Sequence, residues 1–160
     1  RGATITQGDA MADNLAPKQF DVVIGNPPFG PVKDGAGNNV DFEVGGFTTR
    51  EIDHAIALKS LEKMKDDGSA VLIVGGINKM ITDPKARADA YNGKAKREFY
   101  FRLYSQYNVV DHFTVDGSLY ERQGAGWPVD LIVIKGRGKS ALSLPAVRAP
   151  RQYNSWQELT

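Results

Sequence analysis

Four consecutive residues, Asn26-Pro27-Pro28-Phe29, carry the groups needed for chemistry on a planar amino group. The Asn26 side chain offers a carbonyl oxygen, and Pro27, which has no N–H, offers only its backbone carbonyl oxygen. Two acceptors that converge on one exocyclic NH₂ draw its nitrogen lone pair out of conjugation. Phe29 adds a flat face on which a base can stack, a contact that stabilises binding by about 1–3 kcal/mol. An amine held in this way beside an electrophilic methyl group would be methylated.

The residues before this tetrapeptide predict where it lies. Val22, Val23 and Ile24 form a short β-branched block that is typical of a buried parallel strand. The two prolines end the strand, because neither can donate a backbone N–H. Asn26 is therefore expected just past the carboxyl end of the strand, where open α/β sheets bind ligands. The alternative is a plain turn that puts Phe29 in the core; the agreement of strand, loop and following glycine argues against it.

The next segment predicts one α/β unit. Apolar residues from Ile52 to Met64 recur mostly at spacings of three and four, which indicates a helix with one apolar face. Asp66-Asp67-Gly68 predicts a turn in which the glycine can take a positive φ. The apolar run over residues 70–74 then predicts a fully buried strand.

The second half of the chain predicts another helix and two strands. Residues 95–107 form an aromatic-rich helix whose apolar side packs on the core. Residues 109–115 and 129–135 predict strands that can pair as an antiparallel hairpin with a long connection. The expected fold class is therefore α/β, with helices on the faces of the sheet.

Two segments leave their role open. Residues 30–50 are rich in glycine with little apolar periodicity, which predicts a long loop that is either a lid over the site or disordered. Residues 77–97 carry six lysines and arginines, offset by Asp83 and Asp89. Such a run is either a solvated face or a rim that contacts phosphates.

The chain resembles amino-group methyltransferases that use S-adenosylmethionine, most closely the N6-adenine DNA methyltransferases of restriction-modification type. Residues 20–29 are similar to the family's catalytic motif, and Ile5 to Ala10 resemble its third motif. The resemblance covers about residues 3–140. It implies a partial Rossmann-like methyltransferase sheet, mostly parallel with a reversed C-terminal hairpin, and direct methyl transfer from S-adenosylmethionine to the amino group of a flipped adenine in DNA.

The same resemblance implies roles for individual residues. Asp9, Ala10 and Asn26 would bind the cofactor, and the catalytic residues would be Asn26, Pro27, Pro28 and Phe29. Phe29 and Tyr120 would hold the flipped base from its two faces, since enzymes that act on a base extrude it and stack it between apolar or aromatic side chains. Trp127 is a weaker candidate for the role of Tyr120.

The family's glycine-rich cofactor loop has no counterpart in this sequence, because no glycine cluster lies between a strand and a helix. We therefore expect residues 1–138 to be a partial catalytic domain without its cofactor-binding half, inactive in isolation. Residues 139–160 are expected to be a linker or tail toward a missing module. The strand over residues 22–24 would then have an unpaired apolar edge, which predicts dimerisation or poor order at the amino end.

Other functions stay open at this point. A base in RNA or a glutamine side chain in a protein offers a similar planar nitrogen, so either could be the methyl acceptor. The chain could also be a catalytically dead module that binds nucleic acid or protein. A net charge of +1 does not distinguish these alternatives.

Composition excludes several kinds of chemistry. Without cysteine the chain forms no disulfides and has no thiolate nucleophile. His54 and His112 are far apart and give no metal-ligand spacing, so we expect no metal. No apolar run approaches the roughly 20 residues that span a bilayer, and the start does not resemble a signal peptide. We expect a cytoplasmic location, in the bacterial or phage context that the resemblance implies.

Overall fold

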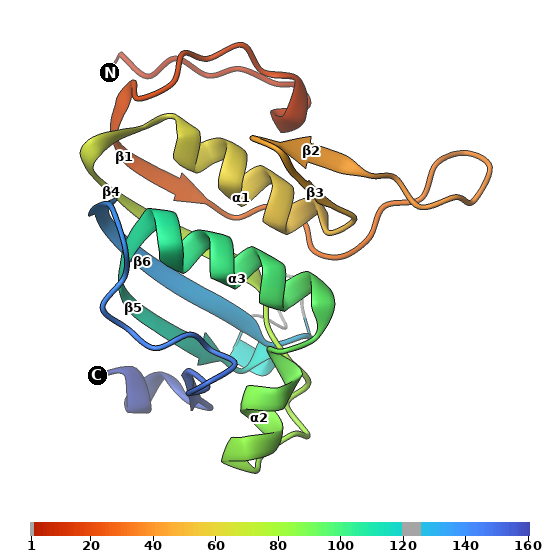
Figure 1. Cartoon of the computed structure of the whole chain (residues 1–160), viewed down its shortest axis with the longest axis vertical. Coiled ribbons are helices and arrows are strands. Elements are labelled where there is room, and N and C mark those ends of the chain that lie inside the picture. Colours follow the sequence, from red (N-terminus) through yellow and green to blue (C-terminus); the bar gives the residue numbers. More distant parts are fainter. Residues whose placement is uncertain (1, 120–125) are drawn as a thin grey trace.

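A five-stranded sheet in the order β1-β4-β6-β5-β7 forms the centre of the molecule (Figure 1). The computed structural model describes residues 2–119 and 126–160. Four of the strands run in one direction, and β6 is antiparallel to both of its neighbours. The expected α/β class, with a mostly parallel sheet and a reversed strand, is confirmed. The five strands are β1 (Phe20–Gly25), β4 (Met64–Gly75), β5 (Tyr107–Val115), β6 (Val129–Arg137) and β7 (Arg151–Tyr153).

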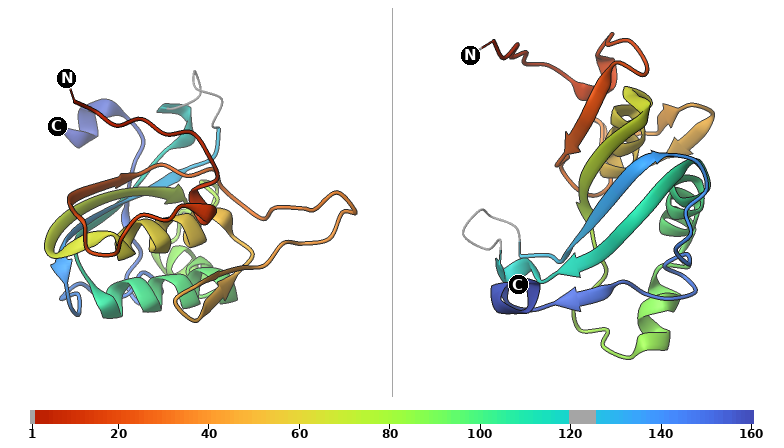
Figure 2. Two further views of the ribbon diagram at one scale, coloured as in Figure 1. Left: turned by 90° about the horizontal axis from the view of Figure 1, so that it is seen from above. Right: turned by 90° about the vertical axis from the view of Figure 1, so that its left-hand side faces the viewer.

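Helices α1 (Ile52–Glu62) and α3 (Lys94–Gln106) cover one face of this sheet (Figures 1 and 2). The shorter α2 (Pro84–Ala90) begins with a cap in which the Asp83 side chain accepts from the backbone N–H of Ala86. The core forms where alternate strand residues meet the apolar sides of α1 and α3. Its fully buried members include Ala55, Leu61, Leu72, Val74, Phe99, Leu103, Ile132 and Ile134. Within the described ranges, no helix is both long and apolar enough to cross a membrane.

The strand after α1 begins earlier than the sequence predicted. Asp66 to Gly68 lie within β4, so the expected turn is wrong, and Gly68 has no positive φ. Glycine is required there because neighbouring atoms leave no room for a side chain. An added Cβ would lie 2.6 Å from Met64 Cγ and 3.0 Å from the Asp21 carbonyl oxygen. This crowding accompanies an irregularity in the β1–β4 pairing between Phe20 and Val22.

Residues 30–50 are more ordered than a plain loop. They contain an antiparallel pair, β2 (Phe42–Val44) and β3 (Phe47–Thr49), joined through Gly45 and Gly46, which both have positive φ. Val44 and Phe47 are buried in the main core, whereas the segment before β2 extends away from the body of the molecule (Figure 1). Strands of three residues are too short to give a periodic pattern, so the sequence did not reveal them.

The strand that leads to Asn26 lies at the edge of the sheet, not in its centre. Only Val23 faces the core; Val22 and Ile24 are 60% and 76% exposed, so the prediction of a strand buried on both faces is wrong. Residues 3–7 form no strand. The unpaired apolar edge is confirmed, and association through it stays a prediction.

The segment 139–160, expected to be a linker or tail, contributes to the sheet. Its strand β7 pairs parallel with β5, and a 3₁₀ helix, η3 (Trp156–Leu159), follows. The Ser140 hydroxyl also donates to the Val109 carbonyl oxygen at 2.9 Å. The sheet therefore continues beyond residue 138.

One buried carboxylate, that of Asp130, connects several helices and strands. Asp130, the second residue of β6, is inaccessible to solvent. It accepts hydrogen bonds from the hydroxyl groups of Tyr91 (2.9 and 3.0 Å), Tyr100 (2.7 Å) and Thr114 (2.8 Å). His112 Nε2 lies 3.2 Å from the same carboxylate. The donors come from the end of α2, from α3 and from β5, so one side chain fixes the positions of all three.

The protonation of Asp130 follows from these contacts. Burial alone would raise the pKa of its carboxyl, but neighbouring His112, the charge of Lys96 and the Tyr100 hydroxyl together hold the pKa below its usual value. Because the folded-state pKa lies below the unfolded value of about 3.9, the ionised carboxylate stabilises the fold at neutral pH. That stabilisation is lost as the pH falls through the folded-state pKa.

Replacing Tyr100 by phenylalanine should destabilise the fold. Tyr100→Phe removes one donor from a buried charged acceptor, and we expect the free energy of unfolding to fall by about 1.5–3 kcal/mol. Tyr153→Phe is the matched control, because its ring contacts survive the change and its hydroxyl has no partner in the described part of the chain. Urea unfolding measures both, and equal effects of the two substitutions would contradict the role of Asp130.

Candidate active site

The Asn26-Pro27-Pro28-Phe29 segment lies directly after the carboxyl end of β1, as the sequence predicted. The Asn26 side chain is exposed and makes no hydrogen bond to another described residue. Pro27 is buried, whereas Phe29 is 36% exposed. The loop thus presents an uncommitted amide next to a partly exposed aromatic ring.

Phe29 lines a pocket of about 420 Å³. That volume lies within the range of about 300–1,000 Å³ that small-molecule sites occupy. The indole of Trp127 lines the same pocket, so two aromatic side chains from distant parts of the sequence meet here. The remaining lining residues come mainly from the start of α1, the end of β4 and the start of α3: Gly30, Glu51, Asp53, His54, Gly75, Gly76, Ala90, Gly93, Lys94, Ala95 and Lys96.

Two successive glycines at the end of β4 lie between these aromatics. An added Cβ on Gly75 would lie 3.6 Å from Phe29 Cβ. The Trp127 Nε1–H donates to the carbonyl oxygen of Gly76 at 2.9 Å. An added Cβ on Gly76 would lie only 2.9 Å from the Pro128 carbonyl oxygen and 3.2 Å from Asp130 Oδ1. Only glycine fits at position 76, and the polar cluster around Asp130 lies directly beneath it.

The backbone of both glycines is held by hydrogen bonds at every polar group. Asp53 Oδ2 accepts from the Gly75 N–H at 3.0 Å, and Lys96 Nζ donates to the Gly75 carbonyl oxygen at 2.8 Å. The Gly76 N–H donates to the Pro128 carbonyl oxygen at 2.8 Å, beside the Trp127 contact. This part of the pocket is therefore built before any ligand binds.

Charged and titratable groups surround the pocket on one side. Burial, together with the nearby Asp53 carboxylate, raises the pKa of Glu51. Burial lowers the pKa of His54 to about 4, so the imidazole is neutral at pH 7. Its ring stacks on Phe99 with the centroids 4.1 Å apart. His54 thus packs on α3 while also lining the pocket.

Asp9 and Ala10, predicted to bind the cofactor, do not share this pocket. Asp9 is exposed, and its carboxylate accepts from the Met11 N–H at 2.9 Å at the start of the 3₁₀ helix η1 (Ala10–Ala12). That helix is held on α1, where Lys59 donates to the Met11 carbonyl oxygen. Residues 3–7 form no strand that would place Asp9 and Ala10 beside Asn26, and their role in cofactor binding stays a prediction.

The sequence offered two aromatic residues, Tyr120 and Trp127, as partners of Phe29 around the base. Tyr120 lies outside the described residues. Trp127, the weaker candidate in the sequence, lines the pocket with Phe29. The sequence reasoning missed Asp53 and Lys96. A Gly-Gly pair directly after a buried strand was the available signal, because such a pair permits close approach of other groups.

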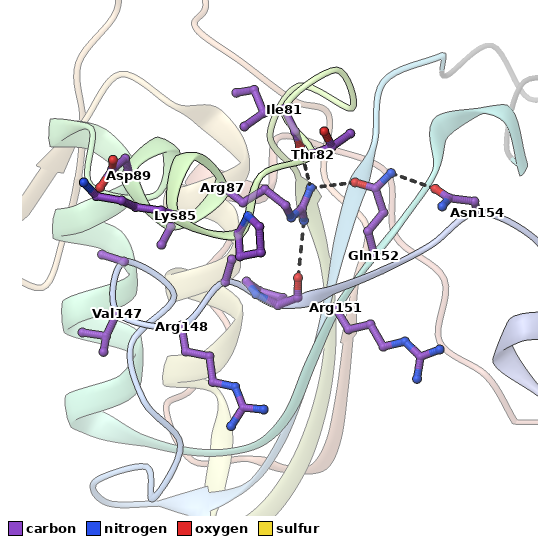
Figure 3. Close-up of a pocket in the computed structure, with 15 residues that line it drawn as sticks. Ile81, Thr82, Lys85, Arg87, Asp89, Val147, Arg148, Arg151, Gln152 and Asn154 are labelled. Atoms are coloured by element: carbon purple, nitrogen blue, oxygen red, sulfur yellow. Dashed lines mark hydrogen bonds between the residues drawn. The ribbon is translucent and has the colours of Figure 1, made fainter.

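A larger hollow, of about 710 Å³, lies elsewhere between α2 and residues 146–154 (Figure 3). None of the residues from Asn26 to Phe29 lines it. Of these four residues, Phe29 lines the smaller pocket, whereas Asn26, Pro27 and Pro28 are not among the residues that line it.

Comparison with known proteins bears on the fold. No protein-family model matches the sequence, and the comparison with curated proteins gives no match. A chain from a structure on complex assembly and conformational transition of the type I restriction-modification system matches with a TM-score of 0.51 and 15% identity, over 77% of this chain and 22% of that one. A modification subunit of a putative type I restriction enzyme from Vibrio vulnificus YJ016 matches with a TM-score of 0.49 and 15% identity, over 77% of this chain and 24% of that subunit.

The chain thus spans about a quarter or less of the length of either protein. At this identity, the match of TM-score 0.51 is a likeness of fold. The fold of this chain is therefore similar to that of part of a chain from a type I restriction-modification system.

Proposed function

We propose that this chain is the acceptor side of an amino-group methyltransferase that acts on adenine N6 in DNA. The observation that carries the proposal is the position of Asn26-Pro27-Pro28-Phe29 at the carboxyl end of β1, with Phe29 and Trp127 lining one pocket. The fold likeness to a restriction-modification chain supports it. The RNA-base, protein-glutamine and binding-module alternatives predict different results in the experiments below.

The chemistry assigned to the loop is positioning of the amine. A flipped base would stack on Phe29, and its amino group would donate to the Asn26 side-chain oxygen and the Pro27 carbonyl oxygen. These two acceptors would concentrate the lone pair on the amino nitrogen and aim it outward. Position and hydrogen bonding supply most of the rate in such a site, so no side-chain base is required.

Trp127 is the second aromatic that we assign to the base. The residue is 50% exposed, while its indole N–H donates to the Gly76 carbonyl oxygen. An anchored ring loses little further freedom when a base binds.

The methyl donor would be S-adenosylmethionine, the cofactor that the resemblance implies. Asp9, which the resemblance assigns to the donor, caps η1 and does not line the pocket beside Phe29. We therefore assign donor binding to residues outside this chain, and the chain alone is expected to transfer no methyl group.

Asn26→Ala should abolish methyl transfer in the protein that contains this chain. Loss of one preorganised hydrogen-bonding group in an active site costs about 100- to 1,000-fold in rate, and Asn26 is exposed, so the fold should not change. The assay follows labelled methyl groups into DNA, RNA and protein. Asn92→Ala, which also removes an exposed amide, is the control and should keep full activity.

Retained activity in Asn26→Ala would end the proposal. Label found in RNA or protein but not in DNA would favour the alternative acceptors. Absence of transfer to any acceptor by the unaltered protein, with the donor bound, would favour the binding module.

Trp127→Ala should weaken the use of DNA without abolishing chemistry. Loss of about 1–3 kcal/mol of stacking corresponds to a rise of roughly 5- to 150-fold in KM for the DNA substrate. Trp127→Phe keeps a ring and loses the bond to Gly76, and we expect most of the affinity to return. Phe101→Ala removes an exposed aromatic outside the pocket and should change nothing. An unchanged KM in Trp127→Ala would remove Trp127 from the site.

A further inference from the structure

The hollow between α2 and residues 146–154 is lined by an excess of basic side chains (Figure 3). Lys85, Arg87, Arg148 and Arg151 contribute four positive charges, against the single carboxylate of Asp89. None of the four forms an ion pair within the described ranges. Positive charge is therefore in excess here, with Asp89 as the one carboxylate among the lining residues.

Arg87 is the buried member of this group. Only 8% of the residue is exposed, yet its guanidinium contacts neutral acceptors rather than a carboxylate. Nη1 donates to the Gln152 side chain at 2.7 Å and to the Ile81 carbonyl oxygen at 3.3 Å, and Nη2 donates to the Pro150 carbonyl oxygen at 3.3 Å. These bonds use three of its five N–H groups. One N–H on Nη2 and the Nε–H have no acceptor among the described residues.

A buried cation usually has an anionic partner, because burial without one is costly. Here the neutral acceptors hold the guanidinium in place and leave donors for an external anion. Lys85, Arg148 and Arg151 are exposed at the rim of the same hollow. A buried arginine with exposed cations at the rim of the same hollow suits a phosphate group, which accepts from a guanidinium in a bidentate manner.

We infer that this hollow binds the phosphodiester backbone of duplex DNA. The choice of DNA rests on the proposed function. Helix α2 supports it, because Ala88 and Asp89 line the hollow while the next residue, Ala90, lines the pocket beside Phe29. A duplex held by its backbone on one side of α2 would thus be kept close to the pocket on the other. Backbone contacts position a duplex without reading its sequence.

The test compares two double variants of the 160-residue chain that remove the same charge. Lys85→Gln with Arg148→Gln changes the rim and leaves the hydrogen bonds of Arg87 intact. Lys135→Gln with Lys139→Gln removes two exposed lysines that do not line the hollow. Binding of a labelled DNA duplex is followed by fluorescence anisotropy between about 50 and 200 mM salt. An RNA duplex of the same sequence is the second ligand.

We expect the rim variant, Lys85→Gln with Arg148→Gln, to lose two phosphate contacts. The slope of log affinity against log salt should fall by about 1.8 in magnitude, and affinity at about 0.1 M salt should fall by roughly 60-fold. The control variant should bind as the unaltered chain does, and both should unfold at the same urea concentration as that chain.

Equal weakening by the two double variants would mean that net charge, not this hollow, attracts DNA, and would overturn the inference. So would an unaltered chain that does not bind DNA, or one that binds RNA more tightly. The result is separate from the Asn26 test, because this experiment measures duplex binding through the rim of the hollow, whereas the Asn26 test measures methyl transfer. Rim-dependent binding would stand as a DNA site even if methyl transfer failed to depend on Asn26.

Discussion

A carboxylate that is removed from solvent must be satisfied by donors from the protein, and Asp130 imposes that requirement on this fold. Its donors are Tyr91 at the end of α2, Tyr100 on α3 and Thr114 on β5, while Asp130 itself lies on β6. Hydrophobic packing alone would leave the helices free to slide by small amounts. Directional hydrogen bonds to the fixed Asp130 carboxylate prevent such sliding, and so they set where the helices end relative to the sheet.

That position determines the shape of the candidate active site. Gly76 lies against Asp130 and Pro128 so closely that no side chain fits, and Gly75 continues the same surface toward Phe29. Asp53 and Lys96 then hold the backbone of Gly75 from α1 and α3. The pocket is thus the open end of a rigid polar cluster, whereas Asn26 extends from the less supported edge strand. A rigid surface beside an uncommitted amide is what the proposed function requires, with the methyl donor held by other residues.

Local patterns were enough to predict α1, α3, most strands and the position of Asn26, because apolar periodicity and prolines act over short distances. The short helix α2 was not predicted, since its residues were interpreted only as part of a charged run. The hairpin within residues 30–50 and strand β7 were not predicted, because strands of three residues are too short to show an alternation of apolar and polar positions. The pocket itself could not be predicted in full. Trp127 and Lys96 reach Gly75 and Gly76 only because β6 lies between β4 and β5. The order of strands in a sheet cannot be inferred from the sequence of any one segment. The cofactor residues were transferred from a resemblance whose supporting strand is not formed here.

The most direct measurement of the central claim is a crystal structure of the protein that contains this chain, bound to duplex DNA and an unreactive analogue of the methyl donor. The account predicts one adenine out of the helix, stacked between Phe29 and Trp127. Its amino nitrogen should lie at hydrogen-bonding distance, about 2.7–3.2 Å, from both Asn26 Oδ1 and the Pro27 carbonyl oxygen. An extruded base bound elsewhere, or an Asn26 side chain turned away from the amino group, would contradict it.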